Sequence, residues 1–161
     1  MTFQDILGNE LIKDQLKTAI RTRRLQHAYL LTGEKGMGKK SMMEAFLLEL
    51  FCTAPAADGT PCCSCPSCRK ILSGNHPDVT TVTHGKPSTI SVDEIREQIT
   101  DTVDIRPYEG GHRVYVVPDA DRMTVQAQNA LLKTLEEPPA YVIIFLLAND
   151  DKALLETVRS R

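Results

Sequence analysis

The sequence predicts an α/β fold built on a parallel sheet. Short apolar segments typical of strands alternate along the chain with segments whose apolar residues recur at helical spacing. A glycine-rich loop follows the first of these strands, and a segment rich in helix-favouring residues follows the loop. With 161 residues and 42% hydrophobic content, the chain is long enough for one domain with a full core and a small insert.

The first elements flank the glycine-rich loop. Asn9 is a candidate N-cap for a helix whose apolar residues continue at helical spacing to position 20. Residues 27–32 form a short apolar strand that runs into the loop, and residues 40–51 favour helix. The last turn of the first helix is expected to hold three arginines, where cations interact favourably with the helix dipole: Arg21, Arg23 and Arg24.

The remaining elements continue this alternation. Residues 79–83 alternate like a strand, and residues 113–117 and 141–147 are apolar strands on either side of a helix that the proline pair 138–139 ends. Four buried strands connected by helices predict a parallel sheet. A further helix is expected after the candidate cap Ser91, with an apolar face made by Val92, Ile95, Ile99 and Val103.

The glycine-rich loop has the pattern of a phosphate-binding loop. In a working loop, backbone N–H groups hold the phosphates, a lysine reaches the terminal phosphates, and the next Ser or Thr hydroxyl ligates Mg²⁺. Here Lys40 stands at that hydroxyl position, where a cation repels the metal, and Ser41 comes one residue late. The alternative is a glycine-rich turn without a ligand. The residues that would contact phosphate are Gly33, Gly36, Gly38 and Lys39.

A second loss lies after the strand 113–117. An active P-loop ATPase carries an acid there to hold Mg²⁺, often followed by a glutamate that orients the attacking water. This chain has Pro118 and Asp119. Because proline offers no side-chain oxygen, both protein contributions to the metal site are damaged, and the two losses together predict that hydrolysis is absent.

The cysteines form a candidate metal site. Four of the five have the spacing C-x9-C-x2-C-x2-C, which suits four thiolates around a tetrahedral Zn²⁺ in a closed, structural site. The alternative is a set of reduced thiols without metal. Cys63 is surplus and is expected to be free, in a turn position where glycine would be more comfortable, and His76 is expected to be a turn residue rather than a ligand. The four candidate ligands are Cys52, Cys62, Cys65 and Cys68.

Charge and hydropathy argue against two classes of protein. A net charge of -2 gives no overall basic surface, so bulk charge does not predict nucleic-acid binding. No apolar run approaches the ~20 residues that span a bilayer, and no signal-peptide pattern begins the chain. The expected location is the cytoplasm, where clustered cysteines indicate metal rather than disulfides. Residues 154–161 are still helical in pattern and carry no capping residue, so we expect a fragment of a longer protein.

Taken together, these motifs resemble a known family. The glycine-rich loop, the four-cysteine insert, residues 114–123 and the run Asn-Ala-Leu-Leu-Lys-Thr-Leu-Glu-Glu-Pro-Pro at 129–139 are similar to the bacterial clamp-loader AAA+ subunits of DNA polymerase III. The resemblance covers nearly the whole chain. It implies a three-layer P-loop NTPase (AAA+) domain over residues 1–161, with a parallel sheet and a small zinc-binding insert at 52–68, that forms the first domain of a longer subunit.

The resemblance also distinguishes two branches of the family. Gamma and tau subunits carry a threonine after the loop lysine and an Asp-Glu pair after the following strand, whereas delta-prime subunits commonly lack both. Lys40, Pro118 and Asp119 therefore resemble the delta-prime pattern. This implies a non-hydrolysing stator that helps load the sliding clamp, within an assembly of gamma/tau and delta subunits that meets the clamp and primer-template DNA. That assembly belongs to the DNA polymerase III holoenzyme, a DNA-directed DNA polymerase and nucleotidyltransferase.

The same resemblance suggests roles for residues near the end of the chain. Ser160 and Arg161 match the family's Ser-Arg-Cys motif, whose arginine acts in trans on a neighbouring subunit's ATP. Asn149 occupies the family's sensor-1 region, although a helix cap or turn at 149–150 explains it equally well. Three charged residues lie on a helix that is near DNA and subunit interfaces in the family, and we expect them to form a solvated face: Lys133, Glu136 and Glu137.

Two other hypotheses compete with the delta-prime-like one. The first is an active gamma/tau-like ATPase in which Ser41 is shifted into the metal site and Asp119 serves as the acid. The second, from another class, is a nucleic-acid-binding zinc module on an inert α/β scaffold. The few basic residues near the cysteines weigh against this second hypothesis: Arg69, Lys70 and Lys86. Structural Zn²⁺ is the expected cofactor, and weak ATP binding by the damaged loop stays open.

Overall fold

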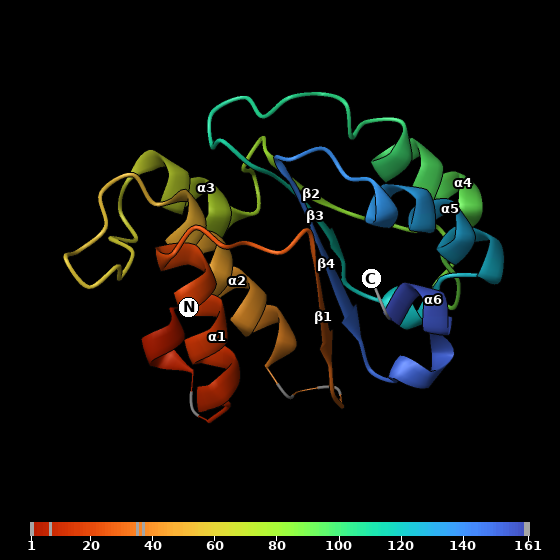
Figure 1. Cartoon of the computed structure of the whole chain (residues 1–161), viewed down its shortest axis with the longest axis horizontal. Helices are drawn as coiled ribbons and strands as arrows, with labels where there is room; N and C mark the ends of the chain where they lie inside the picture. The colour runs from red at the N-terminus through yellow and green to blue at the C-terminus, as the bar shows by residue number, and fades with distance from the viewer. Residues whose placement is uncertain (1, 7, 35, 37, 160–161) are drawn as a thin grey trace. The chain divides into compact units, whose positions relative to one another are not determined.

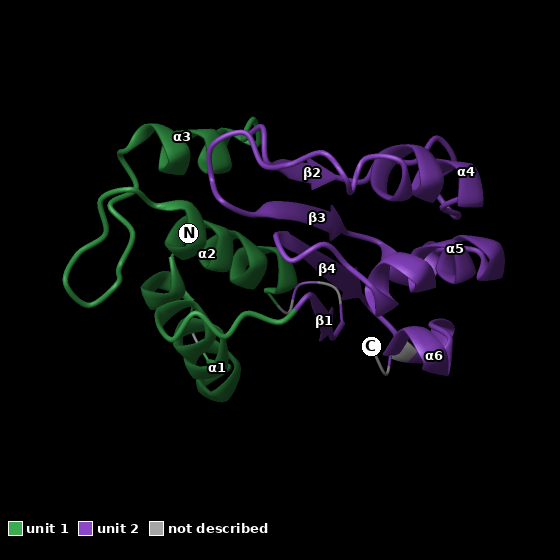
Figure 2. Cartoon of the chain, turned by 45° about the horizontal axis from the view of Figure 1, so that its top comes forward, with its two compact units in different colours: residues 1–26, 38–76 green, residues 27–37, 77–161 purple. Residues whose placement is uncertain are grey.

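The computed structural model describes residues 2–6, 8–34, 36 and 38–159. The chain divides into two compact units, which Figure 2 shows in different colours. The first unit comprises residues 1–26 and 38–76, and the second comprises residues 27–37 and 77–161. The glycine-rich loop is thus shared, because residues 33–37 belong to the second unit and residues from 38 onward belong to the first.

The first unit is helical (Figure 1). After a short 3-10 turn at Phe3–Asp5, it contains α1 (Glu10–Arg21), α2 (Lys39–Phe51) and α3 (Pro66–Ser73), and α2 packs against both α1 and α3. Much of α2 is buried, as expected for a helix with apolar residues on most of its faces.

The first helix contains the predicted apolar residues, but the roles of the residues at its two ends differ from the prediction. Asn9 stands at the N-cap position, but its backbone is left-handed (φ 55°) and its side chain makes no capping hydrogen bond. Only Arg21 lies in the last turn. Arg23 is beyond the helix end with φ 57°, and the amide of Arg24 donates back to the carbonyl of Ala19, so these two arginines belong to the turn that ends the helix.

The helix α3 was not predicted, although its boundary signals are present in the sequence. Cys65 caps it by accepting a hydrogen bond from the amide of Cys68, and Pro66 occupies the first helical position. Gly74 ends it with φ 75°, a conformation that glycine adopts without steric cost. This cysteine-rich segment was interpreted as an irregular loop, so the helix boundary signals were overlooked.

The second unit is built on a four-stranded sheet with strand order β1-β4-β3-β2. The strands are β1 (Ala28–Thr32), β2 (Val79–Thr81), β3 (Arg113–Val117) and β4 (Val142–Ala148), and every neighbouring pair is parallel. The predicted parallel α/β fold is thereby confirmed. The expectation of four buried strands was wrong for two of them, since only β3 and β4 are buried throughout and the edge strands β1 and β2 are partly exposed.

Helices of the second unit pack together and onto the sheet core. The capping box predicted at Ser91 is present, with Ser91 and Glu94 bonding to each other's backbone amides at the start of α4 (Val92–Ile95). The helix continues as a π-helical segment, Arg96–Thr100, and stops before Val103, which was predicted to lie within it. The helix α5 (Val125–Glu136) is capped by Thr124 and packs against α4.

The core of this unit joins these helices to the central strands. Ile95, Ile99 and Leu131 from the helices are fully buried with Tyr115 and Ile144 from the strands. Truncating one such side chain, as in Leu131→Ala, would cost about 2–5 kcal/mol of unfolding free energy. The chain then passes through a 3-10 turn, Asp151–Ala153, into α6 (Glu156–Arg159). Among the described helices, none has the length and apolar character needed to cross a membrane.

Candidate metal centre and nucleotide-binding edge

Four thiols of the first unit converge on one point. The Sγ atoms of Cys52, Cys62, Cys65 and Cys68 all lie within 4.8 Å of one another, and we refer to these residues as the cysteine cluster. Cys52 ends α2, Cys68 lies in α3, and the other two precede α3. The Sγ atoms of Cys52 and Cys62 are 3.6 Å apart. This separation is too long for a disulfide, and it matches the roughly 3.8 Å between sulfur atoms around a tetrahedral Zn²⁺.

Backbone amides between residues 64 and 68 donate to sulfur atoms of the cysteine cluster. Cys62 Sγ accepts from the amides of Ser64 and Cys65 at 3.4 and 3.2 Å, and Cys65 Sγ accepts from the amide of Cys68 at 3.4 Å. The hydrogen bond from Ser64 is the main reason that the pKa of Cys62 is lowered. Burial acts oppositely at Cys68, where it raises the pKa of the thiol. Four cysteines arranged in this way could hold a metal ion, which binds thiolates and displaces their protons.

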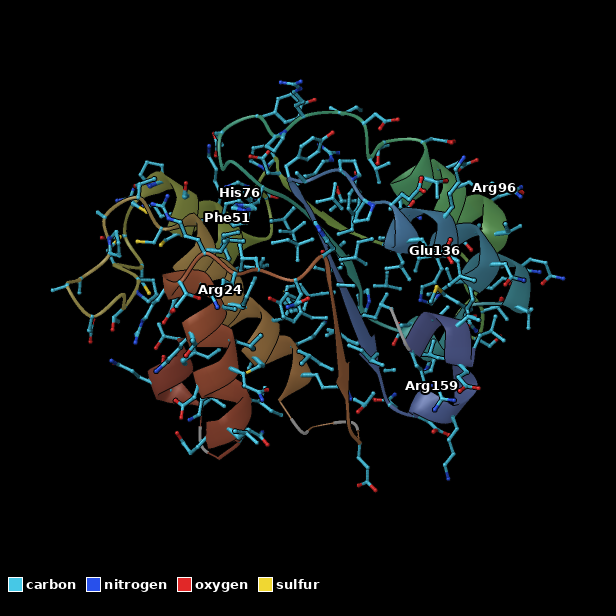
Figure 3. The ribbon with its side chains drawn as sticks, in the orientation of Figure 1. Arg24, Phe51, His76, Arg96, Glu136 and Arg159 are labelled. Atoms are coloured by element: carbon cyan, nitrogen blue, oxygen red, sulfur yellow. The ribbon has the colours of Figure 1, made fainter. Side chains whose placement is uncertain are left out.

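Two residues near the cluster lie outside the set of candidate ligands. Cys63 is exposed and has φ 60°, the left-handed conformation expected at a position better suited to glycine. His76 is only 4% exposed, and its ring packs against that of Phe51 at 4.5 Å between centroids (Figure 3). Its predicted place in a turn was therefore incomplete: His76 is a packed residue of the first unit.

The glycine-rich loop requires glycine at two described positions. Gly36 and Gly38 have φ values of 92° and 85°, which side-chain-bearing residues rarely adopt. Gly38 immediately precedes α2, and its carbonyl accepts the first helical hydrogen bond, from the amide of Met42 at 2.9 Å. Lys39 and Ser41 are partly buried in the first turn of α2, whereas Lys40 is exposed. Lys35 and Met37 lie outside the described residues.

Within the second unit, three strands bring candidate residues to one edge. The register pairs Thr32 of β1 with Ala148 of β4, and Val117 of β3 with Leu146 of β4. The amide of Gly33 donates to the carbonyl of Ala148 at 3.2 Å. Gly33, Pro118 and Asn149 therefore follow the carboxyl ends of three adjacent parallel strands, where α/β folds bind ligands. We call this row of positions the carboxyl edge.

The carboxylate of Asp119, which follows Pro118 at this edge, lies against the ring of His84. Its Oδ2 lies 3.2 Å from Nε2 of His84, and Nδ1 of the same ring lies 2.6 Å from the carbonyl oxygen of Lys86. Both ring nitrogens therefore face acceptors, and only a protonated imidazole can donate to both. The hydrogen bond to Lys86 and the contact with Asp119 raise the pKa of His84.

The segment that carries His84 is held beside the connection between β3 and α5. Glu94 accepts hydrogen bonds from the amides of Gly85 and Ser91 at 2.8 and 2.9 Å. Ile90 pairs with the connection through its amide and carbonyl, which bond to Arg122 and Thr124. This partner of Asp119 was missed in the sequence, because residues 85–89 look irregular and no spacing relates position 84 to position 119.

Three further sets of predicted residues remain: Asn149, the pair at 160–161 and the charged residues of α5. Asn149 is exposed after β4, and the turn there is stabilised by Asp150, whose Oδ1 accepts from the amide of Lys152 at 2.9 Å. Ser160 and Arg161 lie outside the described residues. The three charged residues at α5 and its end that were expected to form a solvated face are all exposed: Lys133, Glu136 and Glu137.

The charged side of α5 borders a groove of about 570 Å³ in the second unit. Lys133 and Arg96 contribute positive charge to its lining, and Asp101, Asp104 and Glu137 contribute negative charge. Because the two signs are mixed, the groove does not select an anion or a cation by charge.

These features define a class of protein. A parallel sheet whose first strand leads through a glycine-rich loop into a helix is the P-loop class of α/β nucleotide-binding domains. The chain belongs to the family described as DNA polymerase III, delta subunit, whose model matches residues 8–161. The family predicted from the sequence motifs is thereby confirmed.

Curated relatives come from more than one branch. The chain is 37% identical over 160 residues to DNA polymerase III subunit tau/gamma of Haemophilus influenzae, covering 99% of this chain and 23% of the relative. It is 37% identical over 136 residues to DNA polymerase III subunit delta' of Pseudomonas aeruginosa, covering 84% of this chain and 41% of the relative. The chain thus spans less than half the length of these relatives.

Solved structures agree with the fold. A DNA polymerase III gamma subunit-related protein from Thermotoga maritima superposes with a TM-score of 0.64 at 29% identity, covering 92% of this chain and 44% of that one. A mutant form of RuvB from Thermotoga maritima gives a TM-score of 0.58 at 15% identity, covering 99% of this chain and 45% of that one. The second likeness concerns the fold alone.

Proposed function

We propose that this chain is the nucleotide-binding-like domain of a DNA polymerase III clamp-loader subunit of the delta-prime type. In this proposal the subunit does not hydrolyse ATP. It acts as a stator for neighbouring gamma/tau ATPase subunits and delta in a hetero-oligomer that loads the sliding clamp onto primer-template DNA. The domain would extend over residues 1–161 of a longer subunit, with the zinc-binding insert at 52–68.

The observation that carries the proposal is the ion pair between Asp119 and His84. A carboxylate at this position of an active enzyme would help hold Mg²⁺ or orient water. Here the carboxylate faces the ring of His84, 3.2 Å away, whose pKa the contact raises. The residue before it is Pro118, which has no oxygen to offer from its side chain, and Lys40 replaces the hydroxyl ligand on α2. Each of these three features removes or occupies a group that hydrolysis needs.

The cysteine cluster supports a structural role for metal. All four candidate ligands are thiols, and no histidine or carboxylate joins them among the described residues. Four thiolates fill the tetrahedral coordination of Zn²⁺ and leave no open position for substrate, so we propose that Zn²⁺ would staple the insert between α2 and α3.

The arginine at position 161 would supply the subunit's contribution to chemistry. A guanidinium offers a fixed positive charge and several donors that stabilise a transferring γ-phosphoryl group. We propose that Arg161 acts in trans on the ATP of a neighbouring subunit. A subunit without its own hydrolysis could then complete its neighbour's active site.

A second candidate function is an active gamma/tau-like ATPase. It is favoured by the tau/gamma relative from Haemophilus influenzae, which aligns with 99% of this chain. That function requires Ser41 and Asp119 to bind Mg²⁺, although Ser41 is one residue late and Asp119 is paired with His84.

Reconstitution of the complete subunit with its partners separates the two candidates. We expect Arg161→Ala to lower turnover at the neighbouring ATP site by roughly 10³-fold, as for other arginine fingers. The delta-prime-like function predicts that Lys39→Ala in this subunit does not reduce ATP turnover of the assembly. The gamma/tau-like function predicts that Lys39→Ala removes one site's share of that turnover, and this result would overturn the proposal.

A further inference from the structure

The central strand β3 begins with a buried arginine that has no acidic partner. Arg113 is 7% exposed, and its side chain lies on the same face of the sheet as those of Tyr115 and Val117, because side chains alternate along a strand. Both of these neighbours belong to the core of the second unit. Within the part of the chain that the structure describes, no carboxylate lies within ion-pair distance of Arg113. Charged side chains are almost never buried without a partner, so this arginine requires an explanation.

The contacts of the guanidinium leave most of its donors unused. Its Nε donates to the hydroxyl oxygen of Tyr115 at 2.7 Å, and its central carbon lies 5.4 Å from the centroid of the same ring. Nη1 is fully buried and has no hydrogen-bond partner among the described residues. Because an arginine carries N–H donors on all three nitrogens of the fork, one hydrogen bond from Nε does not satisfy the group.

The polar groups next to Tyr115 do not supply the missing acceptor. The hydroxyl of Tyr115 lies 2.8 Å from Oγ1 of Thr102, and that Oγ1 donates to the carbonyls of Gln98 and Ile99 at 3.0 and 3.1 Å. Since the oxygen of Tyr115 accepts from Arg113, its own proton is available to Thr102. Donation therefore runs in one direction, away from the guanidinium, and ends on backbone carbonyls. This network leaves Nη1 without an acceptor.

The unused donors and the uncompensated charge fit a small oxyanion. The terminal nitrogens of a guanidinium form a planar fork that matches two oxygens of a phosphate or a carboxylate. A water molecule would satisfy an N–H group but would leave the buried charge without a counterion. Because Arg113 is only 7% exposed, a small free ion reaches it more readily than an acidic side chain carried on a partner protein.

From these contacts we propose that Arg113 anchors a binding site for a small oxyanion such as inorganic phosphate. The site lies where β3 begins, at the opposite end of the strand from Pro118 and the carboxyl edge. It is separate from the glycine-rich loop and does not depend on the proposed function. The bound anion would neutralise the buried charge beside Tyr115 and Thr102.

Calorimetric titration of inorganic phosphate into the complete, zinc-replete subunit tests this site. The variant Arg113→Met keeps an apolar stem and removes the guanidinium. Arg106→Met is the matched control, because Arg106 is exposed in the same unit. Lys39→Ala tests whether the glycine-rich loop holds the phosphate instead. All titrations use a chloride-free buffer of constant ionic strength, and circular dichroism checks that each variant is folded.

We expect the wild type to bind phosphate saturably, and Arg113→Met to weaken that binding at least ~10-fold, as expected for the loss of charge-assisted hydrogen bonds. Arg106→Met and Lys39→Ala should stay within about twofold of the wild type, because exposed or distant charges are screened. Chloride lacks the pair of oxygens that matches the fork, so it should bind at least ~10-fold more weakly than phosphate. If Arg113→Met does not fold, Arg113→Lys takes its place: it keeps the charge but loses the fork, so it should also weaken phosphate binding.

Three results would overturn the inference. The first is an absence of saturable phosphate binding, or binding that the loss of the Arg113 guanidinium leaves unchanged. The second is binding that is lost in Lys39→Ala and kept in Arg113→Met, which would assign the phosphate to the glycine-rich loop. The third is equal affinity for chloride and phosphate, which would contradict an oxyanion site. None of them bears on the proposed function, which concerns ATP hydrolysis at the carboxyl edge.

Discussion

The cysteine cluster and the carboxyl edge differ in where their side chains come from. The four thiols of the cluster lie between residues 52 and 68, at the end of α2, in a turn and at the start of α3. The edge gathers residues from the ends of three strands, and the side chain that contacts Asp119 comes from position 84. One set is local in the chain and the other is not.

This difference has chemical consequences. In the cluster, the backbone amides of Ser64, Cys65 and Cys68 donate to sulfurs of nearby cysteines, because one short segment carries both the thiols and these amides. At the carboxyl edge, a side chain from a distant segment can pair with a carboxylate without any change in the sequence motif around that carboxylate. His84 does so at Asp119, which leaves an acidic residue in the sequence but not a free carboxylate in the structure.

The largest effect is expected from removing a ligand of the cluster. Cys68 is fully buried among the four thiols, so Cys68→Ser should abolish stoichiometric zinc binding and lower the thermal midpoint by roughly 10 °C or more, since metal binding and folding are coupled. Metal content by elemental analysis and thermal unfolding would measure both effects.

The control for this prediction is Cys63→Ser. Cys63 is exposed and stands outside the cluster, so the variant should retain its zinc and its midpoint. Equal zinc content in the two variants would show that the cluster does not hold the metal and would remove the contrast with the carboxyl edge.

The next largest effect is expected on Mg²⁺-dependent ATP binding, when the missing metal ligands are restored. Lys40→Thr with Pro118→Asp restores the hydroxyl and the carboxylate that the sequence pattern of an active P-loop ATPase carries at these two positions, and it removes a cation. We expect this pair to strengthen ATP binding in the presence of Mg²⁺ by at least ~10-fold, as measured by calorimetric titration.

The matched control is Lys40→Gln with Pro118→Asn, which removes the same cation and the same proline without supplying a hydroxyl or a carboxylate. It should show no gain that depends on Mg²⁺. An equal gain in both double variants would mean that the lost metal ligands are not the defect.

The smallest effect concerns the ion pair that occupies Asp119. The pKa of His84 is raised in the folded protein above its ordinary value of 6.5, so folding stabilises the protonated imidazole. At pH values below the unfolded pKa the ring is charged in both states and the contribution is fully present. It is lost as the pH rises through the folded pKa.

His84→Gln should therefore lower the thermal midpoint by about 1–3 °C near pH 6 and by less near pH 9, a size typical of solvent-accessible ion pairs. The charged groups near the ring are Asp119 and Glu94, and both favour its protonated form. His27→Gln is the control, since His27 is exposed in the same unit. A pH-independent loss in His84→Gln would contradict an imidazolium at this position.

Local patterns predicted much of this fold. The capping box at Ser91 and the strand Arg113–Val117 appear where the sequence indicates, because helix caps and buried apolar runs are short-range signals. The cysteine cluster was predictable for the same reason. The helix α3 was predictable too, from Pro66 at its start and Gly74 at its end, but the cysteines obscured it.

Contacts between distant segments were not predictable. His84 meets Asp119 because β2 and β3 are neighbours in the sheet, and Gln128 meets Leu155 because α6 returns to α5. No periodicity or spacing encodes either pair. The change from α4 to a π-helical segment at Arg96–Thr100 likewise follows no simple propensity of those residues.

We propose that the carboxyl edge does not support ATP hydrolysis, whereas the cysteine cluster offers four thiols that could hold a metal ion. The most direct test measures Mg²⁺-dependent ATP hydrolysis by the purified, zinc-replete subunit beside its Lys39→Ala variant. The account predicts that neither protein hydrolyses ATP above the rate in buffer. Turnover that requires Mg²⁺ and is abolished by Lys39→Ala would contradict it.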